Sequence, residues 1–237
     1  MPVTTCWSLE WRGVAFGPVL CDAKKGMVAM KSSETWAHIH AERGAMADTL
    51  AGLGAEQWDA PSWCGDWPVR VTAAHILVAA EQTPGRFYLQ MLQAGFRFNV
   101  YAERTARTLA ALDPADMIAR LRARTTTTNR PPAPTVTMLG EVVTHGGDIR
   151  MALGLEHRPD DAALVAVAEN YSRTNLLIGS KRHSAGLRLT ATDSDWSTGA
   201  GPEVSGPLLS LIMAMSGRPQ ACRSLSGEGV STLEGRC

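Results

Sequence analysis

The sequence predicts a mainly α-helical protein, in which an antiparallel four-helix bundle is followed by a small C-terminal α+β appendage. Apolar residues recur at helical spacing in four or five stretches before residue 180. One connection between them, TTTTNRPPAPT at residues 125–135, cannot be helical throughout and indicates a crossover loop. Several amphipathic helices with one long connection are most simply packed as a four-helix bundle. From about residue 185 the pattern changes to short alternating segments and turns, which favours a separate α+β unit.

Start and stop signals define the elements in order. Serine and aspartate caps, proline at first turns and glycine at the ends mark the helices. We expect helices over residues 33–53, 68–82, 85–111, 113–124, 136–153 and 161–179, a strand within 186–192, a helix within 206–217 and a short closing element within 225–235. The predicted domains are an extension at 1–30, the bundle at 31–182 and the C-terminal unit at 183–237.

Composition excludes several classes of protein. Lysine plus arginine and aspartate plus glutamate number 23 each, so the chain lacks the basic surplus typical of nucleic-acid-binding proteins. No apolar run approaches the ~20 residues that cross a bilayer. Five cysteines without regular spacing favour a reducing cytoplasm over a disulfide framework. The first 30 residues lack a signal-peptide pattern, and we expect a poorly ordered extension, with Met27 and Met30 as alternative starts.

The stretch GEVVTHGGDIR carries the candidate functional cluster. On a helix, Glu141, His145 and Asp148 fall within an arc of roughly 60°, so three potential cation ligands face the same way. A surface i,i+4 pair is the simpler explanation for Glu141 and His145, worth a few tenths of a kcal/mol. Two features favour a metal chelate instead. Apolar neighbours leave little polar face, and the glycine pair after His145 costs ~1 kcal/mol per residue relative to alanine, so something must need the space.

His75 lies in the most apolar predicted helix, where it is either a hydrogen-bonded core histidine or a metal ligand. With Glu141 and His145 it would complete a three-ligand site whose fourth position is open, as in catalytic zinc sites. Asp148 is either a partner that orients His145, as carboxylates do for metal-bound histidines, or the salt-bridge partner of an arginine such as Arg150.

The other histidines, one cysteine and the tryptophans have less specific signals. His38 and His40 are two residues apart on a helix, so they face different ways, and we expect both to be exposed. His157 and His183 fall in predicted loops without an evident partner. Cys64 is either a thiol near the mouth of the site or a packed, inert cysteine. Three tryptophans either line a cleft or fix their loop to the bundle, namely Trp58, Trp63 and Trp67.

Two stretches, LGAEQWDAPSWCGDWPVRVTAAHI and LGEVVTHGGDIRMALGL, resemble the actinobacterial family of mycothiol-dependent maleylpyruvate isomerase-like proteins. These are relatives of the DinB/YfiT-like metal-binding four-helix bundles, and the resemblance covers roughly residues 33–235. It implies a divalent metal, usually zinc, held by His75, Glu141 and His145. It also implies a low-molecular-weight thiol, mycothiol or a similar one, as co-substrate.

The implied function is a cytoplasmic, metal- and thiol-dependent enzyme, an isomerase or S-transferase for a small electrophilic substrate. We expect no nucleic-acid or membrane partner, and the sequence is compatible with an oligomer. The alternative is a non-catalytic metal- or small-ligand-binding protein of the same fold, because fold and site can outlast activity. Pro68 and Val71 depart from the family pattern. The change at Pro68 concerns the helix cap, whereas the change at Val71 concerns the lip of the site, so no substrate carries over. Family isomerases also use an arginine from the C-terminal region, and no single one is assigned among Arg182, Arg188, Arg218 and Arg223.

Overall fold

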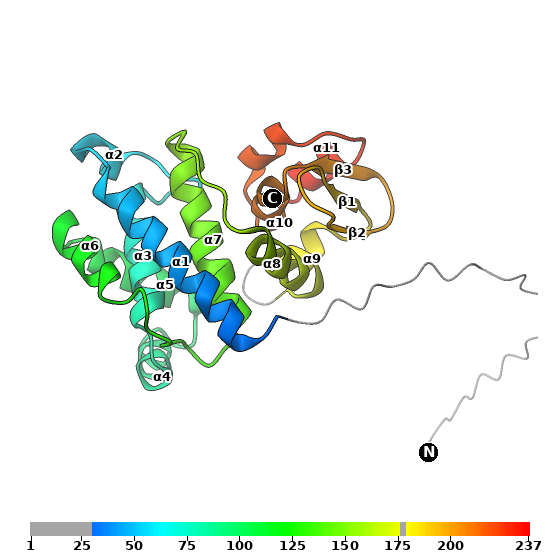
Figure 1. Ribbon diagram of the computed structural model, residues 1–237. Coiled ribbons are helices and arrows are strands. Elements are labelled where there is room, and N and C mark those ends of the chain that lie inside the picture. The colour runs from blue at the N-terminus through cyan, green and yellow to red at the C-terminus, as the bar shows by residue number, and fades with distance from the viewer. Residues whose placement is uncertain (1–29, 176–178) are drawn as a thin grey trace, which may run out of the picture.

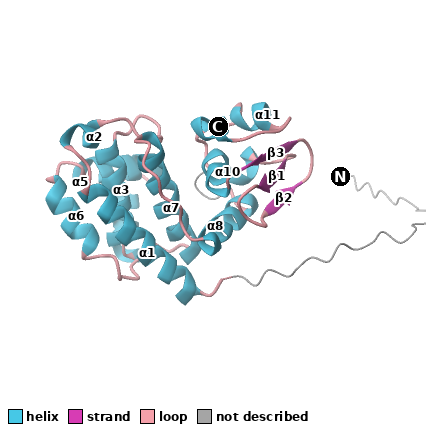
Figure 2. Ribbon diagram, turned by 45° about the horizontal axis from the view of Figure 1, so that its top comes forward, coloured by secondary structure: helices cyan, strands magenta, loops and turns pink. Residues whose placement is uncertain are grey.

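The computed structural model describes residues 30–175 and 179–237, and it confirms a mainly helical bundle with a small C-terminal sheet (Figures 1 and 2). The expectation of a poorly ordered extension falls almost wholly on residues 1–29, outside the described part. The helices before the sheet are α1 (Ser32–Ala51), α2 (Ala55–Asp59), α3 (Val69–Glu81), α4 (Pro84–Gln93), α5 (Phe98–Leu109), α6 (Pro114–Arg122), α7 (Thr135–Ala152), α8 (Asp161–Arg173) and α9 (Ser180–His183). The remaining elements are β1 (Arg188–Ala191), β2 (Ser197–Gly199), β3 (Glu203–Gly206), α10 (Leu208–Met215), the 3-10 helix η1 (Pro219–Ser224) and α11 (Val230–Glu234).

Helix α7 is the central element of the bundle. It packs against α1 and α3, while α6 contacts both of those helices and α5 lies on α3 (Figure 1). Their facing sides supply fully buried residues such as Met46 of α1, Leu77 of α3 and Leu139 of α7. Each such side chain contributes roughly 1.5–3 kcal/mol on burial, so the core fixes how α3 and α7 face each other. Among the described residues, no helix has the length and apolar character of a membrane span.

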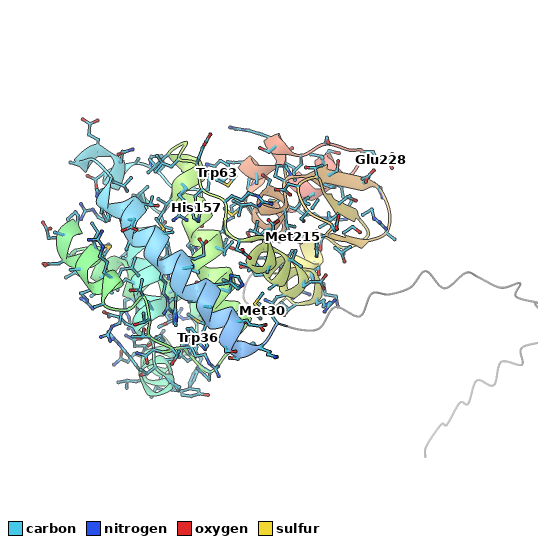
Figure 3. All side chains as sticks on the ribbon, in the orientation of Figure 1. Met30, Trp36, Trp63, His157, Met215 and Glu228 are labelled. Atoms are coloured by element: carbon cyan, nitrogen blue, oxygen red, sulfur yellow. The ribbon has the colours of Figure 1, made fainter. Side chains whose placement is uncertain are left out.

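The C-terminal part is a three-stranded sheet covered by α10. Strand β1 is central, antiparallel to β2 and parallel to β3, with Leu189 opposite both Thr198 and Val204. Helix α10 packs on this sheet and also on α8 and α7, and its Met215 is buried where the two parts meet (Figure 3). Because α8 contacts both α7 and α10, the packing is continuous across the predicted division at residues 182 and 183, which stays a prediction.

Glycines on α7 allow its neighbours to approach closely. A Cβ placed at Gly140 would lie 2.8 Å from the Tyr171 hydroxyl of α8, and one at Gly147 would lie 2.9 Å from the Met213 sulfur of α10. Both separations are shorter than normal packing contacts. The expectation that close packing requires the glycines following His145 is therefore confirmed for Gly147.

Three local predictions differ from the structure. The long helix expected over 85–111 is two helices, α4 and α5, because Gly95 and Phe96 adopt left-handed φ values of 60° and 58° between them. The loop after α1 contains the short helix α2. Helix α8 ends at Arg173, where Thr174 turns to extended backbone, so the expected extent of 161–179 was too long. The caps on α6 and α8 are confirmed, since Asp113 accepts from Ala115 N at 2.8 Å and Asp160 accepts from Ala162 N at 2.9 Å.

Candidate metal centre

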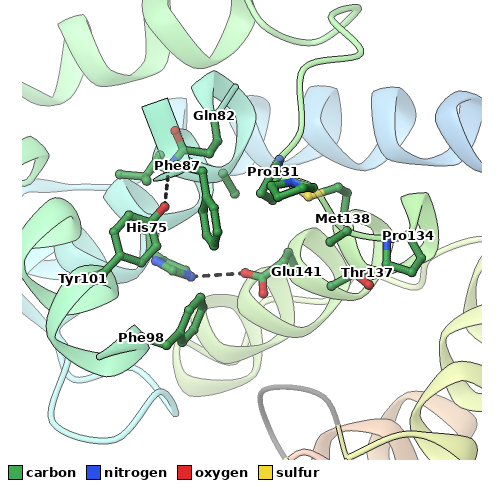
Figure 4. A pocket seen from close by; sticks show the side chains of 14 residues that line it. His75, Gln82, Phe87, Phe98, Tyr101, Pro131, Pro134, Thr137, Met138 and Glu141 are labelled. Carbon is green, nitrogen blue, oxygen red and sulfur yellow. Dashed lines mark hydrogen bonds and ion pairs between the residues drawn. The ribbon is translucent and has the colours of Figure 1, made fainter. Parts of the chain in front are cut away.

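His75 of α3 and Glu141 and His145 of α7 meet inside the bundle. Nε2 of His75 lies 3.1 Å from Oε2 of Glu141, and Nε2 of His145 lies 3.4 Å from the same oxygen (Figure 4 shows the first pair). The two imidazole rings are edge to face, with centroids 4.7 Å apart. One ligand atom from each residue can be chosen so that all lie within 4.8 Å of one another. Packing of α3 on α7 thus brings together residues that are 66 positions apart in the chain.

Asp148 holds the ring of His145 in place. Nδ1 of His145 donates to Oδ2 of Asp148 at 2.9 Å, and an ionised carboxylate only accepts, so the proton lies on Nδ1 and Nε2 faces Glu141. Asp148 is fully buried, and its carboxylate accepts two hydrogen bonds from Arg218. Nε donates to Oδ1 at 2.9 Å and Nη2 donates to Oδ2 at 2.7 Å. Asp148 therefore has both kinds of partner that the sequence suggested. Its arginine is Arg218, whereas Arg150 donates to Thr49 instead.

Burial and charge oppose each other at the two carboxylates. Burial raises the pKa of Asp148, but Arg218 and His145 outweigh it and hold that pKa below its usual value. Burial likewise raises the pKa of Glu141, and the two histidines reverse the shift, so this pKa also lies below its ordinary range. For His145, burial lowers the pKa, and hydrogen bonds led by the one to Asp148 raise it well above normal. Both carboxylates of the centre are therefore ionised, and His145 and Arg218 supply the opposing positive charge.

The donor set fits a divalent metal ion. Two imidazoles and one carboxylate beside an open space match the arrangement of catalytic zinc sites. The carboxylate that orients His145 is also a usual feature of metal-bound histidines. The match at His75 is less complete, because its Nδ1 is buried without a hydrogen-bond partner among the described residues. A second group, Cys64 with His145 and Asp148, also lies within 4.8 Å, but Asp148 is already committed to Arg218.

Two pockets meet at the centre, and both are lined by His75, Phe98 and Glu141. One, of about 200 Å³, is called the apolar lobe here and is lined mainly by Val78, Ala79, Phe87, Met138, Pro131 and Pro134 (Figure 4). The other, of about 330 Å³, is the polar lobe, and its further lining includes Cys64, Trp67, Asn99, Thr144, Tyr171 and Arg218. The centre thus faces two chemically different spaces.

The helical pair α4 and α5 forms one wall of these lobes. Phe87 comes from α4 and Phe98 and Tyr101 from α5, and the Tyr101 hydroxyl accepts a hydrogen bond from Gln82 of the turn after α3 (Figure 4). Sequence reasoning missed these residues. The available signal was the i,i+3 spacing of Phe98 and Tyr101, which places two aromatic rings on one face of a helix.

The tryptophan-rich loop before α3 closes the polar lobe. Within this loop, Ser62 Oγ donates to the Trp67 carbonyl at 2.7 Å. Trp63 N donates to the Asp148 carbonyl at 3.1 Å, which attaches the loop to α7. Cys64 is half-buried in this loop, with its sulfur 3.7 Å from Nη2 of Arg218. Cys64 therefore lies beside the candidate centre and not in the hydrophobic core. The tryptophans divide between the two expected roles, because one is buried in the core (Trp58) and another lines the polar lobe (Trp67).

The other histidines are structural and more enclosed than expected. The exposure predicted for His38 and His40 is wrong, because both are half-buried. His38 lies 3.9 Å from Asp160, and His40 contacts the Thr127 carbonyl at 3.3 Å. Helix α1 is covered on two sides, by α7 and by the segment after α6. The two histidines of the predicted loops also have partners. His157 lies 2.9 Å from Glu42, and His183 lies 2.8 Å from the Met215 carbonyl.

Comparison with known proteins bears on this arrangement. The family model for the mycothiol maleylpyruvate isomerase N-terminal domain matches residues 39–134. The resemblance to this family is confirmed. The match includes His75 and ends before Glu141 and His145, which lie on the next helix. A comparison with curated proteins gives no match.

Two solved structures share the fold. One is a crystal structure of the mycothiol-dependent maleylpyruvate isomerase, with 14% identity, a TM-score of 0.56 and coverage of 84% of this chain and 93% of that chain. The other is a histidine-to-alanine mutant of the mycothiol-dependent maleylpyruvate isomerase, with 13% identity, the same TM-score of 0.56 and the same coverage of 84% and 93%. At these identities the likeness shows the fold, a DinB-like helical bundle with a C-terminal part.

Proposed function

We propose that the protein is a metal- and thiol-dependent enzyme, an isomerase or S-transferase that acts on a small electrophilic substrate. The observation that carries this proposal is the convergence of the His75 and His145 Nε2 atoms on one carboxylate oxygen of Glu141, beside two lobes of different polarity. The match of residues 39–134 to the mycothiol maleylpyruvate isomerase N-terminal domain supports mycothiol as the thiol. The expected location is the cytoplasm.

His75, Glu141 and His145 are the residues that would hold the metal, with zinc the ion that this donor set favours. Bound there, a cation would supply Lewis acidity: the pKa of a low-molecular-weight thiol, ~8.5 when free, would fall, so that the thiolate would be available at neutral pH. A thiolate can add reversibly to an activated double bond, which permits cis–trans isomerisation, or displace a leaving group, which gives S-transfer.

The chain's own side chains prepare this chemistry. Asp148 accepts the proton on Nδ1 of His145, so Nε2 is the ring nitrogen that faces the centre. Arg218 keeps Asp148 ionised and fixed. Trp67 packs edge to face on His75, with ring centroids 5.3 Å apart, and Phe98 borders both lobes, so apolar rings limit the access of water to the centre. Because hydrogen bonds already hold His145 and Asp148 in place, little reorganisation of these groups is needed for reaction.

Elemental analysis of natively purified protein tests the metal site. We expect about one equivalent of zinc or a similar divalent metal, and we expect His145→Ala to lose it, because removal of one of three ligands leaves too few donors. His38→Ala is the matched control, since His38 is half-buried on α1 beside Asp160 and is not one of the clustered candidate ligands. Retention of full metal content by His145→Ala would contradict the proposed site.

Activity is tested separately, with metal-loaded protein, mycothiol and a panel of electrophiles. Product formation that requires mycothiol and disappears in His75→Ala supports the enzyme. Tight binding of metal and ligand without any turnover across the panel would contradict catalysis and favour the non-catalytic binding protein of the same fold.

A further inference from the structure

The apolar lobe restricts which substrates can lie beside the candidate ligands. Its volume is about 200 Å³, and its walls are aliphatic, aromatic and proline side chains. An engineered apolar cavity of ~150 Å³ binds benzene, so a lobe of this size can hold an aromatic ring or an alkyl chain of several carbons. Among the described residues that line it, none is a lysine or arginine, and Glu141 supplies the formal charge. The lobe is therefore suited to an uncharged group.

Nearby cations are already engaged by the protein. Arg218 lies on the polar lobe, where it binds both oxygens of Asp148 and donates to the Ser216 carbonyl at 2.6 Å. Arg120 reaches Glu81 at 2.6 Å. Arg130, beside the proline segment, is exposed and donates to the backbone of that segment. A carboxylate at the end of the apolar lobe away from the candidate ligands would thus be desolvated without a cationic side chain as its partner, which is strongly unfavourable.

The polar groups at the edge of the lobe suit a neutral acceptor. The Tyr101 hydroxyl accepts from Gln82, so its own proton is left for a group such as a ketone oxygen. Burial raises the pKa of Tyr101, which keeps that proton in place at neutral pH.

We propose that the substrate is an uncharged small electrophile, such as an unsaturated ketone, whose apolar group occupies the apolar lobe while its reactive carbon faces His75 and Glu141. The reaction assigned to this substrate rests on the proposed function, whereas its binding rests on the lobe alone. The polar lobe, on the other side of the same residues, is left for the hydrophilic thiol.

Binding of unreactive ketones tests the lobe without turnover. The natively purified full chain is titrated calorimetrically with methyl ketones from 2-butanone to 2-octanone. Each added methylene should strengthen binding about fourfold until the lobe is full. The matched acid, 6-oxoheptanoate, has the same methyl ketone group as 2-heptanone, but its chain ends in a carboxylate. It should bind at least about tenfold more weakly than 2-heptanone. Equal or tighter binding of the acid, or no dependence on chain length, would overturn the proposal.

A substitution that fills the apolar lobe tests whether the ketones bind there. Ala79→Phe places a ring in the lobe one turn beyond His75, so it should abolish the dependence on chain length. Asn99→Phe adds the same ring to the polar lobe and should retain that dependence. Metal content and thermal unfolding show whether each variant is intact, and the ketone and keto-acid comparison on the unchanged protein decides the question if Ala79→Phe does not fold. Loss of the dependence in Asn99→Phe with retention in Ala79→Phe would overturn the assignment of the lobe.

The same reagents separate this inference from the proposed function. Ketone binding with the expected chain-length dependence, but no thiol-dependent reaction of any unsaturated ketone, contradicts the enzyme and leaves the lobe assignment intact. Thiol-dependent turnover of unsaturated keto acids, with no measurable binding of neutral ketones, supports the enzyme and overturns the substrate class.

Discussion

Tyr171 shows how burial sets the chemistry of a single group at the edge of the candidate centre. Its ring is 7% exposed, and its hydroxyl shares a 3.0 Å hydrogen bond with Thr144 Oγ1 on α7. Burial raises its pKa to about 12, and the bond to Thr144 opposes the shift only in part. Tyr171 therefore lines the polar lobe as a neutral hydroxyl, with hydrogen-bonding capacity but no charge.

This shift predicts a pH dependence of stability. The pKa of Tyr171 is about 12 in the folded chain and about 10 when unfolded, so folding favours the protonated phenol. Its contribution is fully present below pH 10 and is lost as the pH rises through 12, by about 3 kcal/mol in total. Urea unfolding of the native chain and of Tyr171→Phe between pH 9 and pH 12 measures it, since the variant lacks the titrating group. Parallel stability curves for the two proteins would contradict this prediction.

At the scale of elements, the glycines of α7 are explained by what packs on them and not by the helix itself. Gly140→Ala would place a Cβ 2.8 Å from the hydroxyl and 3.1 Å from Cε1 of Tyr171, whose ring is held by its bond to Thr144. We expect a loss of about 1–3 kcal/mol in the free energy of unfolding, because an overpacked rigid ring must move.

Gly44→Ala on α1 is the matched substitution, since the nearest atom to its Cβ is a Thr125 methyl at an ordinary 3.7 Å. This change should raise the free energy of unfolding by up to ~1 kcal/mol, through helix propensity alone. Urea unfolding of both variants compares them, and a stabilising Gly140→Ala would show that α8 does not depend on the close approach.

Local signals predicted most helices but not where α4 and α5 separate. Caps and apolar spacing depend on neighbours in the chain, which is why the starts of α6 and α8 at Asp113 and Asp160 were predictable. Apolar periodicity continues through residues 85–111, and the break at Gly95 depends on how Phe87 and Phe98 pack against Tyr101. The contact of Phe87 with Tyr101 joins the two helices, so the sequence of neither helix alone predicts it.

At the scale of the whole molecule, the candidate centre combines local and distant contributions. The spacing of Glu141 and His145 on one helix was enough to predict that they face the same way. The participation of His75 was suggested by resemblance, and its position 3.1 Å from Glu141 depends on the packing of α3 on α7. Arg218 is 70 residues from Asp148 and could not be chosen among the C-terminal arginines. The packing of α10 on α7 places Arg218 beside Asp148, and no local sequence pattern indicates that packing.

The Asp148–Arg218 pair therefore links the C-terminal part to the bundle at the candidate centre. The side chains are 0% and 10% exposed, so removing either partner leaves a buried, unpaired charge. Arg218→Leu and Asp148→Asn should each lower the free energy of unfolding by about 3–5 kcal/mol. The double variant should lose much less than the sum, because neither charge is then left alone. Urea unfolding of all four proteins gives the coupling, and Arg107→Leu, at the exposed Glu103 pair, should change little. Additive losses in the double variant would show that the two parts are held together by other contacts.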